Sequence, residues 1–505
     1  MSRQQSVSLR QLFPNAQIVG ADDIQCRQCL SSSDRPTSNW VFAAGLERDA
    51  DLARDTVDAI NCGAQAILTE QFLPSSVPQC IVSDVREAYA QLCHAVAGNP
   101  SRKMLTIGVV GTHGKTTAAL FLASMLKRIG NRVAYYTSLG ACDGLNAGLP
   151  ANFDNDSHQL AQWMAKSAQN ESPAAIIELT DEMLQSHAAS GIELDVVLFT
   201  GLRKSQRLDR LQSRGIENAL HRVVGQLKQH GIVVYNADDA RLNRWMQRHQ
   251  PVAISYGLDA VADVRGRRIS SLQGEQSMML SAGNCVMPLT SRILGDHNAR
   301  HMLAAAAVGF AFGLELFEIV QGIERMQRIP GRMQRVVGST ECPVYVDSAD
   351  QADRLAVALH AMSKSGKPII CVAEVPDAAT PDQLESYGRV LERAASLVIL
   401  TQSRLSTAMG QKRMWQVLDG CDNPSDVQIV PNRQTAIELA IRSCRPGDQV
   451  LLAGWGANRW TNGQTRIAQS DLECATTVLA TAPAVQSPSA VAATFPRLRL
   501  YGGAA

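Results

Sequence analysis

The chain has 505 residues, of which 45% are hydrophobic, and its 48 basic and 47 acidic side chains leave a net charge of +1. This length accommodates about three domains of roughly 150 residues each, and the balanced charge argues against nucleic acid or an anionic membrane as the main partner. No apolar run approaches the ~20 residues that span a bilayer, and residues 1–13 lack the apolar core of a signal peptide, so we expect a cytoplasmic protein without membrane insertion.

Residues 1–101 are predicted to form a small α/β domain. Short apolar segments typical of strands cover residues 18–20, 40–44, 66–69 and 79–82. Helical periodicity covers residues 51–61 and 85–97. Gly98, Asn99 and Pro100 are turn-forming residues, so we expect the domain to end near residue 101.

The twelve cysteines lack the regular spacing of a disulfide framework. Cys26 and Cys29 form a single C-x-x-C pair, whereas a zinc site needs further ligands at suitable spacing. In a cytosolic protein we expect these cysteines to be reduced and structural, and we predict no zinc site.

A glycine-rich loop opens the second predicted domain, residues 102–330. It consists of Gly111, Thr112, His113, Gly114, Lys115, Thr116 and Thr117. The loop follows a strand pattern over residues 104–110 and precedes helical periodicity, which is the context of a phosphate-binding loop at a helix N-terminus. The lysine can reach the outer phosphates and the hydroxyl of Thr116 can ligate Mg²⁺. The general spacing G-x-x-x-x-G-K-S/T is not met, because Val109 stands where its first glycine would be.

Further apolar runs in this domain are rich in Val and Ile and alternate with helical patterns. They cover residues 174–179, 194–200 and 232–235. Such an alternation indicates a mostly parallel sheet covered on both faces, with ligands outside the carboxyl ends of its strands. Glu178, Thr200 and Asn236 are predicted at those ends.

Residues 331–480 are predicted to form a second doubly wound domain. Its strand candidates cover residues 344–347, 368–373, 397–401 and 449–453. Its helix candidates cover residues 353–362, 383–394 and 435–444. Residues 481–505 are dominated by Ala, Pro and Ser, which predicts a disordered tail.

Up to about residue 480 the chain resembles the Mur ligase family. The shorter loop form G-T-x-G-K-S/T-T is a signature of this family and of its folylpolyglutamate synthetase relatives. Further matches begin at Asn236 (N-x-D-D), Gly295 (G-x-x-N), Pro330 (P-G-R-M-Q-R-V) and Asp347 (the aspartate of D-Y-A-H). The sequence is most similar to the ligases that add diaminopimelate or lysine to UDP-N-acetylmuramoyl-L-alanyl-D-glutamate.

This resemblance implies a fold, a reaction and site residues. The fold is α/β, with a small N-terminal UDP-sugar-binding-like domain, a central P-loop domain and a C-terminal Rossmann-like ligase domain. The activity is an ATP-dependent amide ligation of peptidoglycan biosynthesis, in which an acyl phosphate forms on a UDP-muramoyl-peptide-like acceptor before an amino acid couples to it. Lys115 and Glu178 are implied as catalytic, Asn298, Arg332 and Asp347 as ATP contacts beside the glycine-rich loop, and Thr116 and Glu178 as Mg²⁺ ligands. We expect a monomer.

Several family motifs are changed in this chain. The family's E-V/T-S-S-H corresponds to residues 178–182, which contain no histidine, and residues 219–224 contain no counterpart of its metal-bridging lysine. The D-N-P-R motif that binds the amino acid has no counterpart near residues 401–404. The alternatives are an active ligase, a catalytically degenerate ATP-binding protein with a regulatory or scaffold role, and, least favoured, a generic P-loop ATPase or kinase. If the protein is an active ligase, we expect an amino acid other than diaminopimelate bound in the family's usual way.

Overall fold

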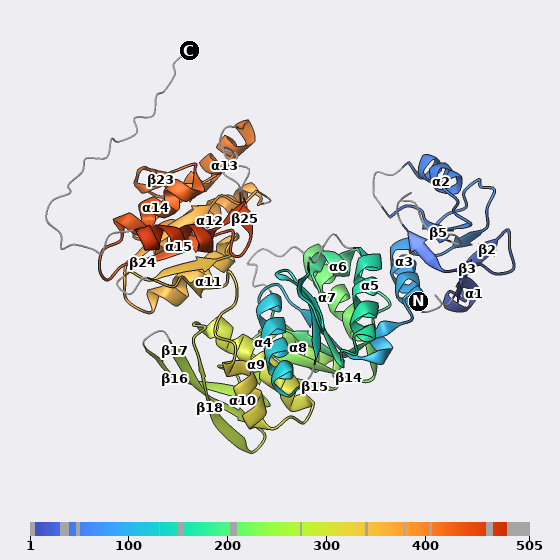
Figure 1. Cartoon of the computed structure of the whole chain (residues 1–505), viewed down its shortest axis with the longest axis horizontal. Coiled ribbons are helices and arrows are strands. Elements are labelled where there is room, and N and C mark those ends of the chain that lie inside the picture. The colour runs from blue at the N-terminus through green and yellow to red at the C-terminus, as the bar shows by residue number, and fades with distance from the viewer. Residues whose placement is uncertain are drawn as a thin grey trace, which may run out of the picture. The chain divides into compact units, whose positions relative to one another are not determined.

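The computed structural model describes residues 6–30, 40–46, 51–130, 132–149, 156–202, 210–272, 275–338, 342–377, 379–402, 407–460 and 468–481. The chain forms two compact units, Met1–Pro330 and Gly331–Ala505, each with its own sheets and cores (Figure 1). Because residues 1–330 form one unit, the division near residue 101 stays a prediction. The predicted tail lies outside the described residues, except for Thr481, which ends the last helix.

The first part of unit 1 is a five-stranded sheet with a helix on each face. In spatial order its strands are β2 (Gln17–Val19), β7 (Gln79–Ile81), β6 (Ala66–Thr69), β5 (Trp40–Ala43) and β4 (Gln28–Leu30). Alternate side chains of β5 enter two different cores, because successive residues of a strand point to opposite faces. One core includes helix α2 (Leu52–Asn61) and the other includes α3 (Val85–Val96). A short strand pair, β1 (Val7–Ser8) with β3 (Gln25–Cys26), and helix α1 (Leu9–Leu12) complete this part.

The rest of unit 1 is built on an eleven-stranded sheet. In spatial order its strands are β11 (Ala147–Leu149), β10 (Gly140–Asp143), β9 (Val133–Thr137), β12 (Ala174–Glu178), β8 (Leu105–Val110), β13 (Leu194–Phe199), β14 (Leu227–Asn236), β15 (Ala253–Gly257), β16 (Val264–Leu272), β17 (Glu275–Ala282) and β18 (Cys285–Ser291). The strands from β9 to β16 are parallel, whereas the outer strands on both sides are antiparallel. The predicted mostly parallel sheet is therefore confirmed.

Helices cover both faces of this sheet. One core packs α4 (Lys115–Arg128), α9 (Asp296–Ala311) and α10 (Leu316–Glu324) against the strands. The other core contains α5 (Ser157–Gln169), α6 (Asp181–Gln185), α7 (Arg210–Gly225) and α8 (Ala240–His249). A 3-10 turn, Pro100–Lys103, leads into β8. Since β8 lies between β12 and β13, its carboxyl end is flanked by theirs: Glu178 is opposite Val109, and Phe199 is opposite Val110.

Unit 2 contains a six-stranded sheet that is parallel except at one edge. In spatial order its strands are β19 (Gln334–Arg335), β20 (Val344–Asp347), β24 (Gln449–Ala453), β21 (Ile369–Glu374), β22 (Leu397–Thr401) and β23 (Gln428–Ile429). One face packs against α11 (Ala352–Ser363), α12 (Pro381–Ala394) and α13 (Ala408–Leu418). The other packs against α14 (Arg433–Ser443) and α15 (Asp471–Thr481), next to the strand pair β25 (Arg459–Trp460) and β26 (Gln469–Ser470).

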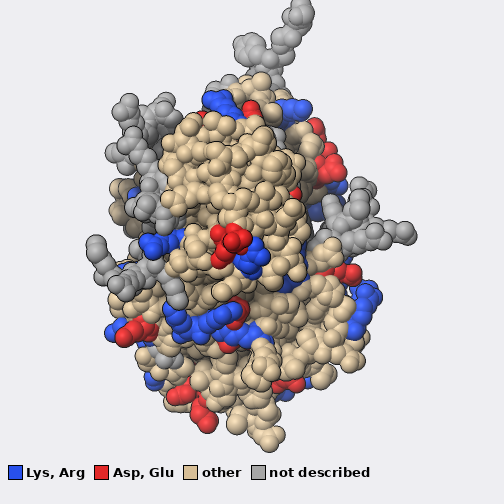
Figure 2. Space-filling view, turned by 90° about the vertical axis from the view of Figure 1, so that its right-hand side faces the viewer, with Lys and Arg blue, Asp and Glu red and all other residues tan. Residues whose placement is uncertain are grey.

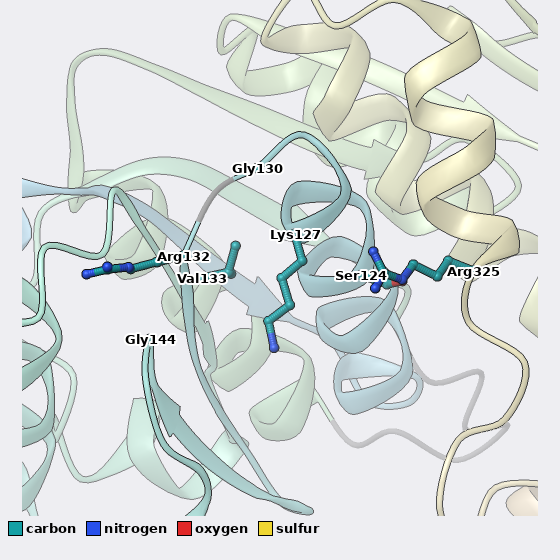
Figure 3. Close-up of a pocket in the computed structure, with 7 residues that line it drawn as sticks. All are labelled: Ser124, Lys127, Gly130, Arg132, Val133, Gly144 and Arg325. Carbon is teal, nitrogen blue, oxygen red and sulfur yellow. The ribbon is translucent and has the colours of Figure 1, made fainter.

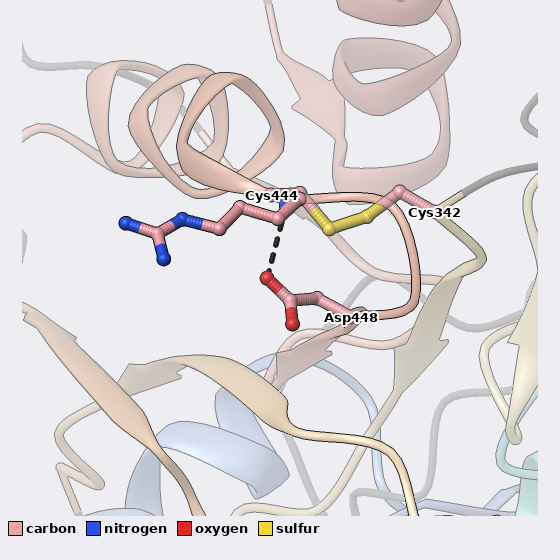
Figure 4. Close-up of a disulfide and its surroundings, with 4 residues drawn as sticks. Cys342, Cys444 and Asp448 are labelled. Atoms are coloured by element: carbon pink, nitrogen blue, oxygen red, sulfur yellow. Dashed lines mark hydrogen bonds between the residues drawn. A yellow bond between two sulfur atoms is a disulfide. The ribbon is translucent and has the colours of Figure 1, made fainter. Parts of the chain in front are cut away.

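A disulfide joins Cys342 to Cys444 in unit 2, with Cα atoms 6.4 Å apart and a sequence separation of 102 residues (Figure 4). Cys342 lies two residues before β20 and Cys444 follows α14, so both lie near the amino ends of neighbouring strands, β20 and β24. The prediction of reduced cysteines is wrong for this pair, which only the sheet order brings together. The other ten cysteines are free, and burial raises the pKa of Cys26 to about 12, which disfavours the thiolate that zinc binding requires.

Among the described helices, none combines the length and apolarity that a membrane span requires. On the face in Figure 2, basic and acidic side chains lie close to one another on a largely uncharged surface. This distribution agrees with the small net charge of the sequence and presents no extended field of one sign on that face.

Candidate functional site

The glycine-rich loop joins the carboxyl end of β8 to the first turn of α4. Gly111 (φ 148°) and Gly114 (φ 79°) both have positive φ angles that L side chains rarely adopt. A Cβ atom on Gly111 would lie 2.1 Å from Thr200 Oγ1, and one on Gly114 would lie 1.9 Å from His301 Cε1. Only glycine fits at these two positions, which keeps the backbone N–H groups of the loop accessible at the helix N-terminus.

The neighbouring strand β13 holds this loop in place. Thr200, which follows β13, donates its hydroxyl hydrogen to the carbonyl of His113 (2.6 Å). The backbone N–H of Thr112 donates to the carbonyl of Gly201 (3.0 Å). In turn, Asn236 at the end of β14 donates its amide to the carbonyl of Thr200 (3.2 Å). Three strand ends thus fix the conformation of the loop.

Lys115 is the first residue of α4, and its ammonium lies within the loop. Nζ donates to the carbonyl of Gly111 (2.7 Å). The charge therefore lies beside the backbone that would surround the outer phosphates of a nucleotide. Thr117, two residues along α4, is buried, and its contact with the nucleotide stays a prediction.

Three oxygen-bearing side chains meet next to Lys115, at the carboxyl ends of β9 and β12. Thr116 donates its hydroxyl hydrogen to Glu178 Oε2 (2.8 Å), and the backbone N–H of Ser138 donates to the same oxygen (2.9 Å). The hydroxyl oxygens of Thr116 and Ser138 are 2.9 Å apart. Hydroxyl and carboxylate oxygens are the ligands that Mg²⁺ prefers, so this donor set fits that ion. Ser138 was absent from the predicted site, although its position directly after an apolar strand was the available signal.

Helix α9 carries Asn298, which the resemblance singled out, and His301. The ring of His301 packs directly on Gly114. Asn298, one turn earlier and only 3% exposed, donates its amide to the carbonyl of Leu294 (2.7 Å) and so stabilises the first turn of α9. Its contact with ATP stays a prediction.

The predicted N-x-D-D segment supports the site from β14. Asp239 accepts a hydrogen bond from the backbone N–H of Leu202 (2.6 Å), and Asp238 forms an ion pair with Arg300 of α9 (2.7 Å). Burial tends to raise the pKa of Asp238, but hydrogen bonds from Ala260 N and Arg300 outweigh it and lower the pKa below its ordinary value. These carboxylates position the loop after β13 and α9.

Other charged residues near the predicted site have different surroundings. Asp181 and Glu182, which follow Glu178 in sequence, are exposed in the first turn of α6. Arg203, Lys204 and Arg207 form a basic cluster in the sequence, and these residues lie outside the described part of the chain. His187 lies 3.8 Å from Asp84 and 3.9 Å from Glu87, and a nitrogen of the Arg222 guanidinium is 2.6 Å from its Nε2. His187 therefore belongs to a polar cluster with α3 and α7.

Arg332 and Asp347 lie close together in unit 2, whereas the other predicted site residues are in unit 1. Arg332 donates to Ser348 Oγ, and the backbone N–H of Met333 donates to Asp347 Oδ2 (2.7 Å). Burial raises the pKa of Asp347 to about 6, against the opposing effects of the Arg332 charge and the Met333 hydrogen bond. Asp347 is buried and Arg332 is partly buried, and the two side chains lie at the carboxyl end of β20.

Comparisons with known proteins cover nearly the whole chain. The model of the Mur ligase middle domain matches residues 109–309, and that of the Mur ligase glutamate ligase domain matches residues 331–456. The UDP-N-acetylmuramoyl-L-alanyl-D-glutamate–2,6-diaminopimelate ligase of Geobacillus thermodenitrificans is 25% identical over 451 residues, which are 86% of this chain and 91% of that protein. The enzyme of the same name from Janthinobacterium sp. is 27% identical over 462 residues, or 85% and 89% of the two chains.

Solved structures agree in fold. A structure of a UDP-N-acetylmuramoyl-L-alanyl-D-glutamate–2,6-diaminopimelate ligase superposes with a TM-score of 0.67 at 21% identity and covers 94% of this chain and 99% of its own. A MurF ligase from Thermotoga maritima in complex with ADP has a TM-score of 0.58 at 17% identity, with 90% and 97% covered. The predicted α/β Mur ligase architecture is confirmed. Since the family matches extend over both units and include the glycine-rich loop, Glu178 and Asp347, the chain belongs to the Mur ligase family.

Proposed function

We propose that the protein is an ATP-dependent carbon–nitrogen ligase of peptidoglycan biosynthesis that acts in the cytoplasm as a monomer. Its acceptor is a UDP-N-acetylmuramoyl-peptide-like carboxylate, and its second substrate is an amino acid. The names of the relatives support this reaction class. The observation that carries the proposal is the arrangement of Thr116, Ser138 and Glu178 beside Lys115, at the N-terminus of α4.

The reaction has two steps. A carboxylate oxygen of the acceptor attacks the γ-phosphorus of ATP, and the bond between that phosphorus and the oxygen of the β-phosphate breaks. ADP departs, and the acceptor now carries an acyl phosphate. The amine nitrogen then attacks the acyl carbon, the bond to the phosphate oxygen breaks, orthophosphate leaves, and the nitrogen loses a proton to water. The first step brings several negative charges together, so positive charge placed there in advance lowers its barrier.

Particular residues supply this stabilisation. Lys115 would hold the outer phosphates, and the N–H groups between Gly111 and Thr116 would bind phosphate oxygens. Mg²⁺ held by Thr116 and Glu178 would neutralise charge on those oxygens. In unit 2, Arg332 and Asp347 are proposed ATP contacts, as is Asn298 of α9 in unit 1.

We expect the amino acid to differ from diaminopimelate, because the D-N-P-R motif has no counterpart near residues 401–404. Arg433 lies near the carboxyl ends of β22 and β24, since it donates to Thr401 Oγ1 (3.2 Å) and to the carbonyl of Ala453 (2.9 Å). Two further hydrogen bonds connect its guanidinium to Asp471 (3.1 and 2.7 Å). These bonds within unit 2 occupy most of the N–H groups of Arg433.

Product formation tests the proposal directly. The purified protein would be incubated with ATP, Mg²⁺, UDP-N-acetylmuramoyl-L-alanyl-D-glutamate and a pool of amino acids that includes meso-diaminopimelate and lysine, and mass spectrometry would identify any adduct. Lys115→Ala should reduce the yield at least about 100-fold, the usual effect of losing one transition-state contact. Lys166→Ala is the matched control, because Lys166 is an exposed lysine of α5.

The outcomes separate the hypotheses. An adduct that is lost only in Lys115→Ala supports a ligase, and its mass identifies the amino acid. Efficient addition of meso-diaminopimelate would contradict the expected specificity while leaving the reaction class intact. Absence of any adduct, with ATP binding that still depends on Lys115, would favour the degenerate ATP-binding protein over the ligase.

A further inference from the structure

A cavity of about 390 Å³ lies in unit 1 at the end of α4 farthest from the glycine-rich loop (Figure 3). It is lined by Ser124, Lys127, Gly130, Arg132, Val133, Gly144 and Arg325. These residues come from α4, the turn into β9, the turn after β10 and the end of α10. In Figure 3, Lys127 projects from α4, Arg325 reaches toward Ser124, and the guanidinium of Arg132 points away from Lys127. Three cations and no carboxylate therefore line the cavity.

The charges of these cations are not neutralised by neighbouring acids. Lys127 lies over the ring of Tyr135, with Nζ 5.0 Å from the ring centroid. Arg132 donates to the carbonyl of Asn170 (3.3 Å). In the part of the chain that the structure describes, neither these two cations nor Arg325 forms an ion pair with a carboxylate. Some other arginines of unit 1, such as Arg268 and Arg300, do have carboxylate partners.

The partial negative charges of nearby helix ends offset only part of the positive charge of these cations. Helices α4 and α10 both end beside the cavity, and each helix C-terminus carries a partial charge of about −0.5, which favours nearby cations. Lys127 lies in the last turn of α4, and Arg325 caps α10. The two helix ends together offset about one unit charge out of three, and Arg132 precedes a strand. A net positive potential remains in the cavity.

We propose that this cavity binds a small, multiply charged phosphate compound of the pyrophosphate class. Its volume lies within the range of small-ligand sites, roughly 300–1,000 Å³. Guanidinium groups match phosphate oxygens with two parallel hydrogen bonds, and Lys127 and Arg325 place positive charge at the cavity. Lys127 is twelve residues beyond Lys115, about 18 Å along the helix axis, so this site is separate from the nucleotide loop and does not depend on the proposed ligase activity.

Calorimetric titration with sodium pyrophosphate tests the proposal. All proteins would be full length and carry Lys115→Ala, which weakens binding at the glycine-rich loop. The test variant adds Lys127→Gln and Arg325→Gln. Its control adds Lys166→Gln and Arg328→Gln, which remove the same charge from exposed residues that do not line the cavity. We expect one binding site per chain, at least tenfold weaker binding in the test variant, and less than a twofold change in the control.

Two further measurements, with the Lys127→Arg variant and with citrate, keep the proposal open to refutation. Lys127→Arg, in the Lys115→Ala background, keeps the charge and should bind pyrophosphate within threefold of the Lys115→Ala protein. This conservative variant tests the role of the charge even if the test variant does not fold. Equal weakening in the test and control variants, or no saturable binding of pyrophosphate, would overturn the site and leave the cations as neutralisers of helix ends. Citrate that binds as tightly as pyrophosphate would overturn the assignment to phosphate compounds.

Discussion

The ion pair between Arg433 and Asp471 makes unit 2 sensitive to a change of one atom. Both side chains are buried, with 4% and 0% exposed, and two hydrogen bonds of 3.1 and 2.7 Å join them. Asp471 also accepts a hydrogen bond from Trp460 Nε1 (2.8 Å). Asp471→Asn keeps the shape and the acceptor for the indole but removes the carboxylate charge, which leaves a guanidinium buried without its main counter-ion.

The expected decrease in the free energy of unfolding follows from these contacts. Removing one partner of a buried ion pair costs about 3–5 kcal/mol. Glu374, with Oε2 3.9 Å from Arg433, remains as a weaker counter-ion, so the lower end, about 3 kcal/mol, is expected. In a unit of this size that loss lowers Tm by about 6–12 °C.

Differential scanning calorimetry is the suitable assay, because the two units need not unfold together. Glu473→Gln is the matched control, since Glu473 lies in the same helix but pairs with Arg459 at the surface, where the two side chains are 48% and 57% exposed. Exposed pairs contribute about 0–1 kcal/mol. A shift for Asp471→Asn no larger than that for Glu473→Gln would refute the reasoning.

Three further predictions concern other parts of the molecule. Gly114→Ala should lower the affinity for ATP at least tenfold, because the added Cβ would collide with His301. Titration of the variant with ATP measures this affinity, and an unchanged value would disprove the packing argument. Burial lowers the pKa of His94 to about 4, so only the unfolded chain is protonated between pH 6.5 and 4, and about 3 kcal/mol of stability should disappear as the pH falls through this range. Denaturant unfolding at several pH values should show this loss in the wild type and not in His94→Leu. Reduction with dithiothreitol should lower the Tm of unit 2, because the disulfide closes a loop of about 100 residues and such a bond stabilises the folded state by about 2–5 kcal/mol. Cys342→Ser should abolish this response. Equal responses of the wild type and the variant would exclude the Cys342–Cys444 bond as its origin.

Much of the architecture is determined locally by the sequence. The strands predicted at residues 344–347 and 397–401 have those bounds in the structure, because buried parallel strands appear as uninterrupted apolar runs. The glycine-rich loop was identifiable because its glycines, lysine and threonine are consecutive. The antiparallel strands β17 and β18 were missed. In β17 the alternation of Met278, Leu280 and Ala282 is short, and its partly exposed neighbours weaken it.

The contacts that complete the sites depend on the tertiary structure instead. Ser138 joins Thr116 and Glu178 only because β9 and β12 are neighbours in the sheet, and His301 reaches Gly114 only because α9 packs on α4. The same holds for the disulfide in unit 2 and for the cationic cavity, whose residues come from segments far apart in sequence. Local propensity and periodicity carry no information about such pairs, because strand order and helix packing decide which distant segments meet.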